Sequence, residues 1–264
     1  MEPFLLLPAY AVVGVVAGLA AGLLGVGGGL IIVPALVVLF SYLGIDDHRM
    51  QLAVGTSLAT IVVTAITSVI AHQKQGAIQW PIFRRLSPGI VFGAVIGAYL
   101  ASRIPSESLK VVFGVVEVVV ALQILRQRKP TPSRRLPGGV TLSLSGSVIG
   151  VISAVVGIGG GTLTVPYLVW CNIALQKAIA TSAACGLPIA LAGSLAYVLF
   201  GWQQGVTVAG ASGFIYWPAF FGIAVTSMLA APYGARLTHR LPTDQLNKVF
   251  ALFLLLVGIS MLIS

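Results

Sequence analysis

Two glycine-rich segments stand out among the residues whose types and spacing could do chemistry. They run from Gly25 to Gly29 and from Gly157 to Gly161, and a Val-Pro pair follows each of them. A glycine inside a helix costs about 1 kcal/mol relative to alanine, so the glycine triplets predict a tight turn between two helices. Such a turn leaves backbone N–H groups free at the start of the next helix, where the helix dipole favours an anion. Close helix packing is the alternative interpretation. The candidate substrate-binding glycines are Gly27, Gly28, Gly29, Gly159, Gly160 and Gly161.

Two hydroxyl pairs follow the glycine segments, at the predicted start of the next full-length helix. They are Thr56 with Ser57 and Thr181 with Ser182. Their side chains could cap that helix or donate to a substrate oxygen, and the sequence leaves both alternatives open. We therefore include all four among the candidate substrate-binding residues.

Glu117 is a carboxylate well inside an apolar run. An ionisable group at membrane depth is costly, so it indicates a functional role, most simply proton coupling or a charge that faces a cavity. A neutral, hydrogen-bonded carboxylic acid with a structural role is the alternative. The equivalent position in the second half of the chain is Leu254.

The apolar runs contain no paired acid and base, activated nucleophile, zinc-ligand spacing or Walker motif. The sequence therefore predicts no catalytic residue, no metal, no cofactor and no direct use of ATP. Cys171 and Cys185 lie in apolar surroundings, where we expect small packing residues.

The composition predicts a membrane protein. Hydrophobic residues make up 58% of the 264 residues and charged residues only 8%, and the apolar runs are long enough to cross a bilayer. The net charge of +9 comes from Lys and Arg in short connections, with no continuous basic face, so nucleic acid is not an expected partner. Met1, Glu2 and Pro3 put no basic flank before the first apolar run, so we do not expect a cleavable signal peptide.

An internal repeat organises the whole chain. The first glycine segment returns 132 positions later as the second, and Gln51 with the Thr56-Ser57 pair returns 125 positions later. A third block, which includes Trp80-Pro81, returns after 137 positions as Trp217-Pro218. Three blocks in the same order predict duplicated halves: residues 1–125, a basic linker at 126–137, and residues 138–264.

Each half should contain a helical hairpin broken at the glycines and three transmembrane helices. The predicted helices of the first half are 4–24, 30–43, 52–71, 86–102 and 108–125. Those of the second half are 140–156, 162–175, 178–200, 217–236 and 244–263.

The basic residues indicate how the two halves face. If the chain turns back at each glycine segment, the fifteen Lys and Arg residues divide twelve to three, with Arg49, Arg103 and Lys110 outside. If the chain continues straight through, they divide eight to seven. Because cytoplasmic loops carry the positive excess, we expect inverted-topology repeats with the linker in the cytoplasm. The predicted fold is thus an all-α polytopic membrane protein with two inverted-topology repeats.

The duplicated Gly-Val-Gly-Gly-Gly and Gly-Ile-Gly-Gly-Gly segments, each followed by Val-Pro, resemble the TauE/SafE family of membrane permeases, also called sulfite exporters. The resemblance covers nearly the whole chain. It implies a permease of the bacterial or archaeal inner membrane that handles sulfite, sulfonates or related small anions, often by export.

The expected function is a secondary transporter of small anions, and the alternative is an anion-selective channel on the same fold. The expected partners are the lipid bilayer, a small anionic substrate and a coupled proton or cation. The substrate, the direction of transport, the coupling ion and the oligomeric state are left open.

Overall fold

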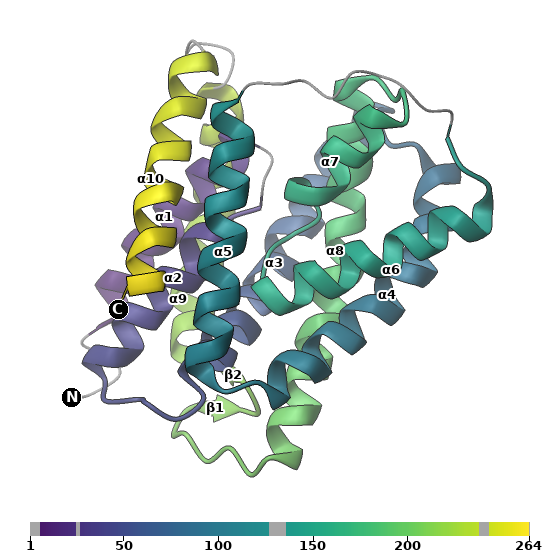
Figure 1. The fold of residues 1–264 in the computed structure, drawn as a ribbon. Helices are drawn as coiled ribbons and strands as arrows, with labels where there is room; N and C mark the ends of the chain where they lie inside the picture. The colour runs from purple at the N-terminus through teal and green to yellow at the C-terminus, as the bar shows by residue number, and fades with distance from the viewer. Residues whose placement is uncertain (1–5, 25–26, 127–135, 238–242, 264) are drawn as a thin grey trace.

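The structure, a computed structural model, describes residues 6–24, 27–126, 136–237 and 243–263. Ten helices run through these residues, and each predicted helix is present (Figure 1). The helices of the first half are α1 (Leu7–Leu24), α2 (Gly29–Tyr42), α3 (Arg49–Lys74), α4 (Trp80–Arg103) and α5 (Ser106–Leu125). Those of the second half are α6 (Gly139–Val156), α7 (Gly161–Trp170), α8 (Leu175–Gln203), α9 (Trp217–Leu237) and α10 (Thr243–Ile263). Most of the predicted linker, from 127 to 135, lies outside the described residues.

The helices form a multi-pass membrane protein. Five of them, α3, α4, α5, α6 and α8, are long and apolar enough to cross a bilayer. Large apolar side chains cover outward faces, as with Val12 at 62%, Phe92 at 65% and Leu195 at 62% exposure. So much exposed apolar surface suits contact with lipid and not with water.

The two halves exchange helices with each other. The first helix of the first half, α1, packs on α9, the fourth helix of the second half, and α6 packs on α4 in the same way. The third helices, α3 and α8, also pair, as do the fifth helices, α5 and α10. In Figure 1, α5 runs toward the upper end of the molecule whereas α10 runs toward the lower end. Repeats of inverted topology would have this arrangement.

Glycines allow the exchanged helices to approach closely. A Cβ atom at Gly14 of α1 would lie 2.6 Å from the carbonyl oxygen of Ile223 on α9. At the equivalent position, a Cβ atom at Gly146 of α6 would lie 2.5 Å from the carbonyl oxygen of Leu86 on α4. No side chain fits at either contact, so Gly14 and Gly146 serve close helix packing.

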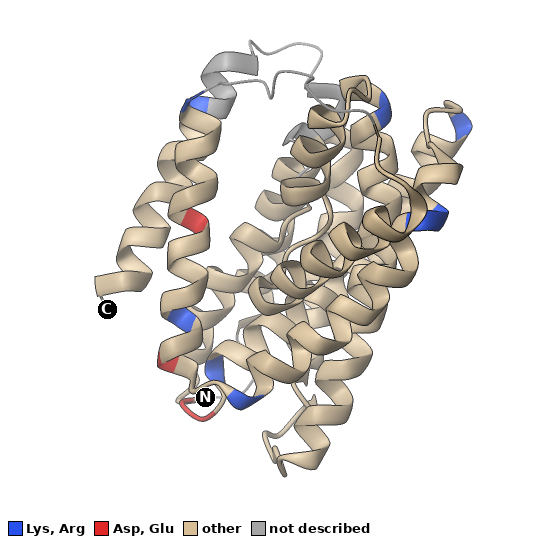
Figure 2. Ribbon diagram, turned by 45° about the vertical axis from the view of Figure 1, so that its right-hand side comes forward, with Lys and Arg blue, Asp and Glu red and all other residues tan. Residues whose placement is uncertain are grey.

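The described Lys and Arg residues lie toward the two ends of the helices. Figure 2 shows the described Lys and Arg residues in two groups, one at the lower end of the molecule and one in its upper part. The lower end also carries a short hairpin, β1 (Ala211–Ser212) paired with β2 (Ile215–Tyr216). Two cations at this end are paired with neighbours, Arg49 with Asp46 and Lys110 with Glu107.

Candidate functional site

The first glycine turn joins α1 to α2. Gly27 has a φ angle of +68°, a left-handed conformation that glycine adopts without steric cost. The N–H of Gly29 donates to the carbonyl oxygen of Gly27, and α2 begins at Gly29. The predicted break between the two helices is thus confirmed, although Gly25 and Val26 lie outside the described residues.

The second glycine turn joins α6 to α7. Gly157 has a φ angle of +75° and ends α6. The N–H groups of Gly157 and Ile158 donate to the carbonyl oxygen of Ser153 at 2.9 and 3.0 Å. The next helix, α7, begins only at Gly161. The backbone between Ile158 and Gly161 therefore belongs to neither helix.

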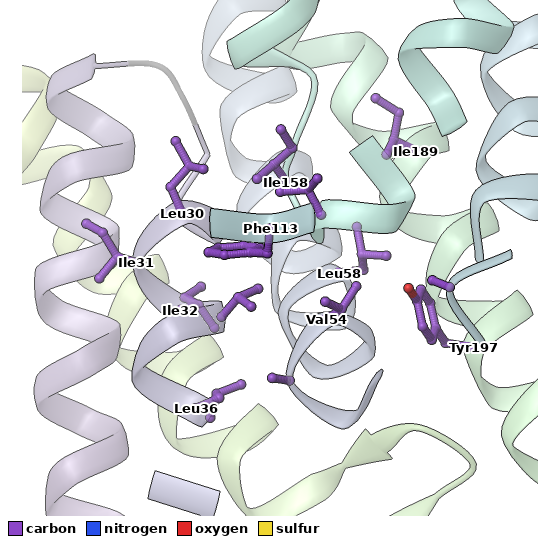
Figure 3. Close-up of a cluster of buried hydrophobic side chains, with 14 of the residues drawn as sticks. Leu30, Ile31, Ile32, Leu36, Val54, Leu58, Phe113, Ile158, Ile189 and Tyr197 are labelled. Carbon is purple, nitrogen blue, oxygen red and sulfur yellow. The ribbon is translucent and has the colours of Figure 1, made fainter. Parts of the chain in front are cut away.

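The two turns meet in the interior of the molecule. A Cβ atom at Gly27 would lie 3.6 Å from the Cα atom of Gly159, its equivalent in the second half. A Cβ atom at Gly29 would overlap the carbonyl oxygen of Gly157. Figure 3 shows the apolar cluster around this contact, with Leu30 of α2 and Ile158 of the second turn both part of it. The glycines therefore bring two helix starts to one place.

The second turn has a row of N–H groups without partners among the described residues. Among the described residues, no backbone hydrogen bond of the turns and caps uses the N–H groups from 159 to 163. The N–H of Thr164 is the first to be used, and it donates to the carbonyl oxygen of Gly160 at 2.9 Å. Gly159 and Gly160 are buried. Because buried N–H groups almost always have a partner, those of Gly159, Gly160 and the buried Thr162 call for water or a ligand.

Thr56 and Thr181 hold backbone of the opposite half. The Thr56 hydroxyl accepts from the N–H of Tyr216 at 2.9 Å, and the Thr181 hydroxyl accepts from the N–H of Gln79 at 3.0 Å. The expectation that these residues open their helices is wrong, because α3 begins at Arg49 and α8 at Leu175. The starts had been predicted from the apolar runs, but each helix begins earlier and includes polar residues such as Arg49 and Gln176 that precede its run.

Ser57 and Ser182 are equivalent residues with different surroundings. The Ser57 hydroxyl donates to the carbonyl oxygen of Gly157 at 2.9 Å, which ties α3 to the second turn. The Ser182 hydroxyl is buried and has no hydrogen-bond partner in the described part of the chain. The backbone of Ser182 lies against the second turn, since a Cβ atom at Gly160 would be 2.7 Å from its carbonyl oxygen. Of the four predicted hydroxyls, Ser182 is thus the one without a partner in the part of the chain that the structure describes.

Glu117 lies on α5 at its packing contact with α10. Its exposure is 0%, and neither carboxylate oxygen has a hydrogen-bond partner among the residues the structure describes. A Cβ atom at Gly258 of α10 would lie 3.2 Å from the Cβ atom of Glu117. The structural alternative is a carboxylic acid that is hydrogen-bonded, and the described residues provide no hydrogen-bond partner for it.

The fold and these turns define the class of protein, a polytopic α-helical membrane protein with two helix starts that meet at its centre. A family model described as "Sulfite exporter TauE/SafE" matches residues 10–261. The chain belongs to the TauE/SafE sulfite exporter family. The resemblance found in the glycine segments is thereby confirmed.

Curated relatives of the chain bear the name probable membrane transporter protein. One from Haemophilus influenzae is 37% identical and covers 96% of each chain. One from Methanocaldococcus jannaschii is 28% identical over 99% of this chain and 97% of the relative. The YunE protein of Bacillus subtilis is 26% identical over 94% of each chain. No solved structure matches the chain.

Proposed function

We propose that the protein is a secondary transporter that exports a small anion such as sulfite, a sulfonate or a related sulfur compound. The description of the family names sulfite export, and the relatives are named as probable membrane transporters. The observation that carries the proposal is the contact between the two glycine turns, with the unpartnered N–H groups of the second turn beside it.

These N–H groups give the proposed site its chemistry. N–H groups at the start of α7 point their positive ends away from the helix, and the helix dipole adds to their attraction for an anion. No Lys or Arg lies within this turn, so the charge of the substrate is balanced by dipoles alone. The proposed binding residues are the glycines of the two turns and the Ser182 hydroxyl, which are Gly27, Gly28, Gly29, Gly159, Gly160, Gly161 and Ser182. Thr56, Ser57 and Thr181 are proposed to position the backbone around the site, because their hydroxyls already bond to backbone groups.

The exchange of helices between the halves offers a route to alternating access. If the halves are inverted repeats, each half can adopt the conformation of the other, which opens the central site first to one side and then to the other. The pairs α1 with α9 and α6 with α4 would move as units because their backbones are in contact. Glu117 is the proposed proton-coupling residue, since it is buried and has no partner in the described part of the chain.

The test is a flux assay in proteoliposomes that contain the purified protein. Sulfite and a sulfonate are loaded inside, and efflux is measured against internal concentration and against an imposed pH gradient. A transporter should saturate at low substrate concentration and respond to the gradient. Flux that rises linearly with concentration and follows only the electrical potential would support the channel instead.

A further inference from the structure

The two glycine turns differ in the side chains around them. In the first half, a small hollow next to the turn is lined by residues that include Ala21, Gly27, Gly28 and Leu30. Its side chains carry no polar atom that could bind an anion. The N–H groups here are also engaged in part, because those of Ile31 and Ile32 both donate to the carbonyl oxygen of Gly28.

The same positions in the second half carry hydroxyl groups. The repeat offset of 132 residues takes Ala21 to Ser153 and Leu30 to Thr162, while Gly27 and Gly28 become Gly159 and Gly160. These positions are therefore polar in the second half and apolar in the first. The glycines themselves are the same in both halves, so at these positions the two halves differ in their side chains.

Both hydroxyls are buried and lack a hydrogen-bond partner within the described ranges. Ser153 has an exposure of 0% and Thr162 of 8%, and neither side-chain oxygen has a hydrogen-bond partner in the described residues. A buried hydroxyl without a partner is unfavourable, so an unused pair beside a row of unused N–H groups suggests a shared missing partner. An anion with several oxygens would satisfy both kinds of donor at once.

We propose that the substrate oxyanion is held asymmetrically, by the hydroxyls of Ser153 and Thr162 together with the N–H groups of the second turn. The first turn then forms the opposite wall, with Leu30 and Ala21 excluding water from that side. This asymmetric site rests on the proposed function and refines it. A site with pseudo-twofold symmetry would use both turns equally, whereas this one uses donors of the second turn. The ligand class is a small oxyanion with its oxygens directed at the second half.

The chain contains a matched control on the same helix. Thr164 is as deeply buried as Thr162, with an exposure of 0%, and its hydroxyl also has no partner among described residues. Residues two apart on a helix point to opposite faces, so Thr164 cannot share the ligand of Thr162. Thr164 follows Gly160 by four residues and lies on the same side as that glycine, which contacts α8.

The experiment measures how far sodium sulfite raises the melting temperature of the full-length protein in detergent. Thr162→Val and Ser153→Ala should each weaken the apparent affinity for sulfite about tenfold or more, because each removes one donor to a charged ligand. Both variants should melt at the same or a higher temperature than the native protein without sulfite, since each loses an unsatisfied polar group. Thr162→Ser should retain the affinity, and Thr164→Val should leave it unchanged.

Equal losses of affinity in the Thr162→Val and Thr164→Val variants would overturn the assignment of the hydroxyls. Unchanged affinity in both Thr162→Val and Ser153→Ala, with binding still lost in Gly159→Ala, would overturn the asymmetric site but leave the proposed function standing. If sulfite, thiosulfate and methanesulfonate all fail to stabilise the native protein, the proposed function fails and this inference fails with it.

Discussion

The Thr56 hydroxyl on α3 accepts a hydrogen bond from the backbone N–H of Tyr216, 2.9 Å away and in the other half of the chain. The equivalent bond joins Thr181 to Gln79 at 3.0 Å. In each case the N–H belongs to the residue just before a Trp-Pro pair that begins the fourth helix of a half. These two bonds thus link each third helix to the start of the fourth helix of the opposite half.

Replacing Thr56 with valine should destabilise the protein without a direct effect on binding. The change leaves the buried N–H of Tyr216 without an acceptor, which costs about 1–3 kcal/mol. Thermal unfolding in detergent measures the loss, and Thr56→Ser, which keeps the acceptor, is the control. A drop in sulfite affinity with unchanged stability would instead make Thr56 a substrate ligand.

Gly159→Ala should weaken anion binding while the protein stays folded. A Cβ atom here would lie 3.6 Å from the Cγ2 atom of Ile61 and 3.8 Å from the Cα atom of Gly27, which are ordinary contact distances. The methyl group would nevertheless crowd the approach of a ligand to the backbone. Affinity is measured by the sulfite-dependent shift in melting temperature, and valine should lower it further than alanine.

Gly160 should respond differently from Gly159. A Cβ atom at Gly160 would lie 2.7 Å from the carbonyl oxygen of Ser182, so Gly160→Ala forces α7 away from α8. We expect this variant to lose stability as well as affinity, with a lower melting temperature in the absence of any anion. A Gly160→Ala protein as stable as the native one would contradict the close contact between this turn and α8.

The topology can be tested with single cysteines in a background where Cys171 and Cys185, both buried, are replaced by alanine. The exposed residues Gln75, after α3, and Gln203, at the end of α8, are suitable positions. The inverted repeat predicts that an impermeant reagent added to intact cells labels Gln203→Cys but not Gln75→Cys. Labelling of both positions, or of Gln75→Cys alone, would contradict the inverted-repeat interpretation.

Glu117→Gln should keep the protein folded and change the pH dependence of transport. The amide has nearly the same shape as the carboxyl group but cannot release a proton, so a coupled proton flux should disappear. Efflux from proteoliposomes at several pH values measures this, with melting temperature as the control for folding. An unchanged pH profile would assign Glu117 to a structural role at the contact between α5 and α10.

The sequence by itself determined the class of the protein and the order of its elements. Apolar runs separated by charged connections locate the helices, because the membrane requires long apolar segments. The duplicated glycine segments predicted both helix breaks and the membership of the family. These features depend on local composition and on self-similarity, and both can be read without coordinates.

Only the tertiary structure decided which of the candidate residues are free to bind. Ser57 and Ser182 occupy equivalent places in the sequence, yet the Ser57 hydroxyl donates to the carbonyl oxygen of Gly157 whereas the Ser182 hydroxyl has no partner among the described residues. The repeat pattern shows that Ser153 and Thr162 replace Ala21 and Leu30 of the first half. The sequence does not show that both hydroxyls are buried, and their burial is what makes them candidate ligands. A hydrogen bond between distant segments depends on how helices pack, and packing brings together residues that the repeat pattern alone cannot pair.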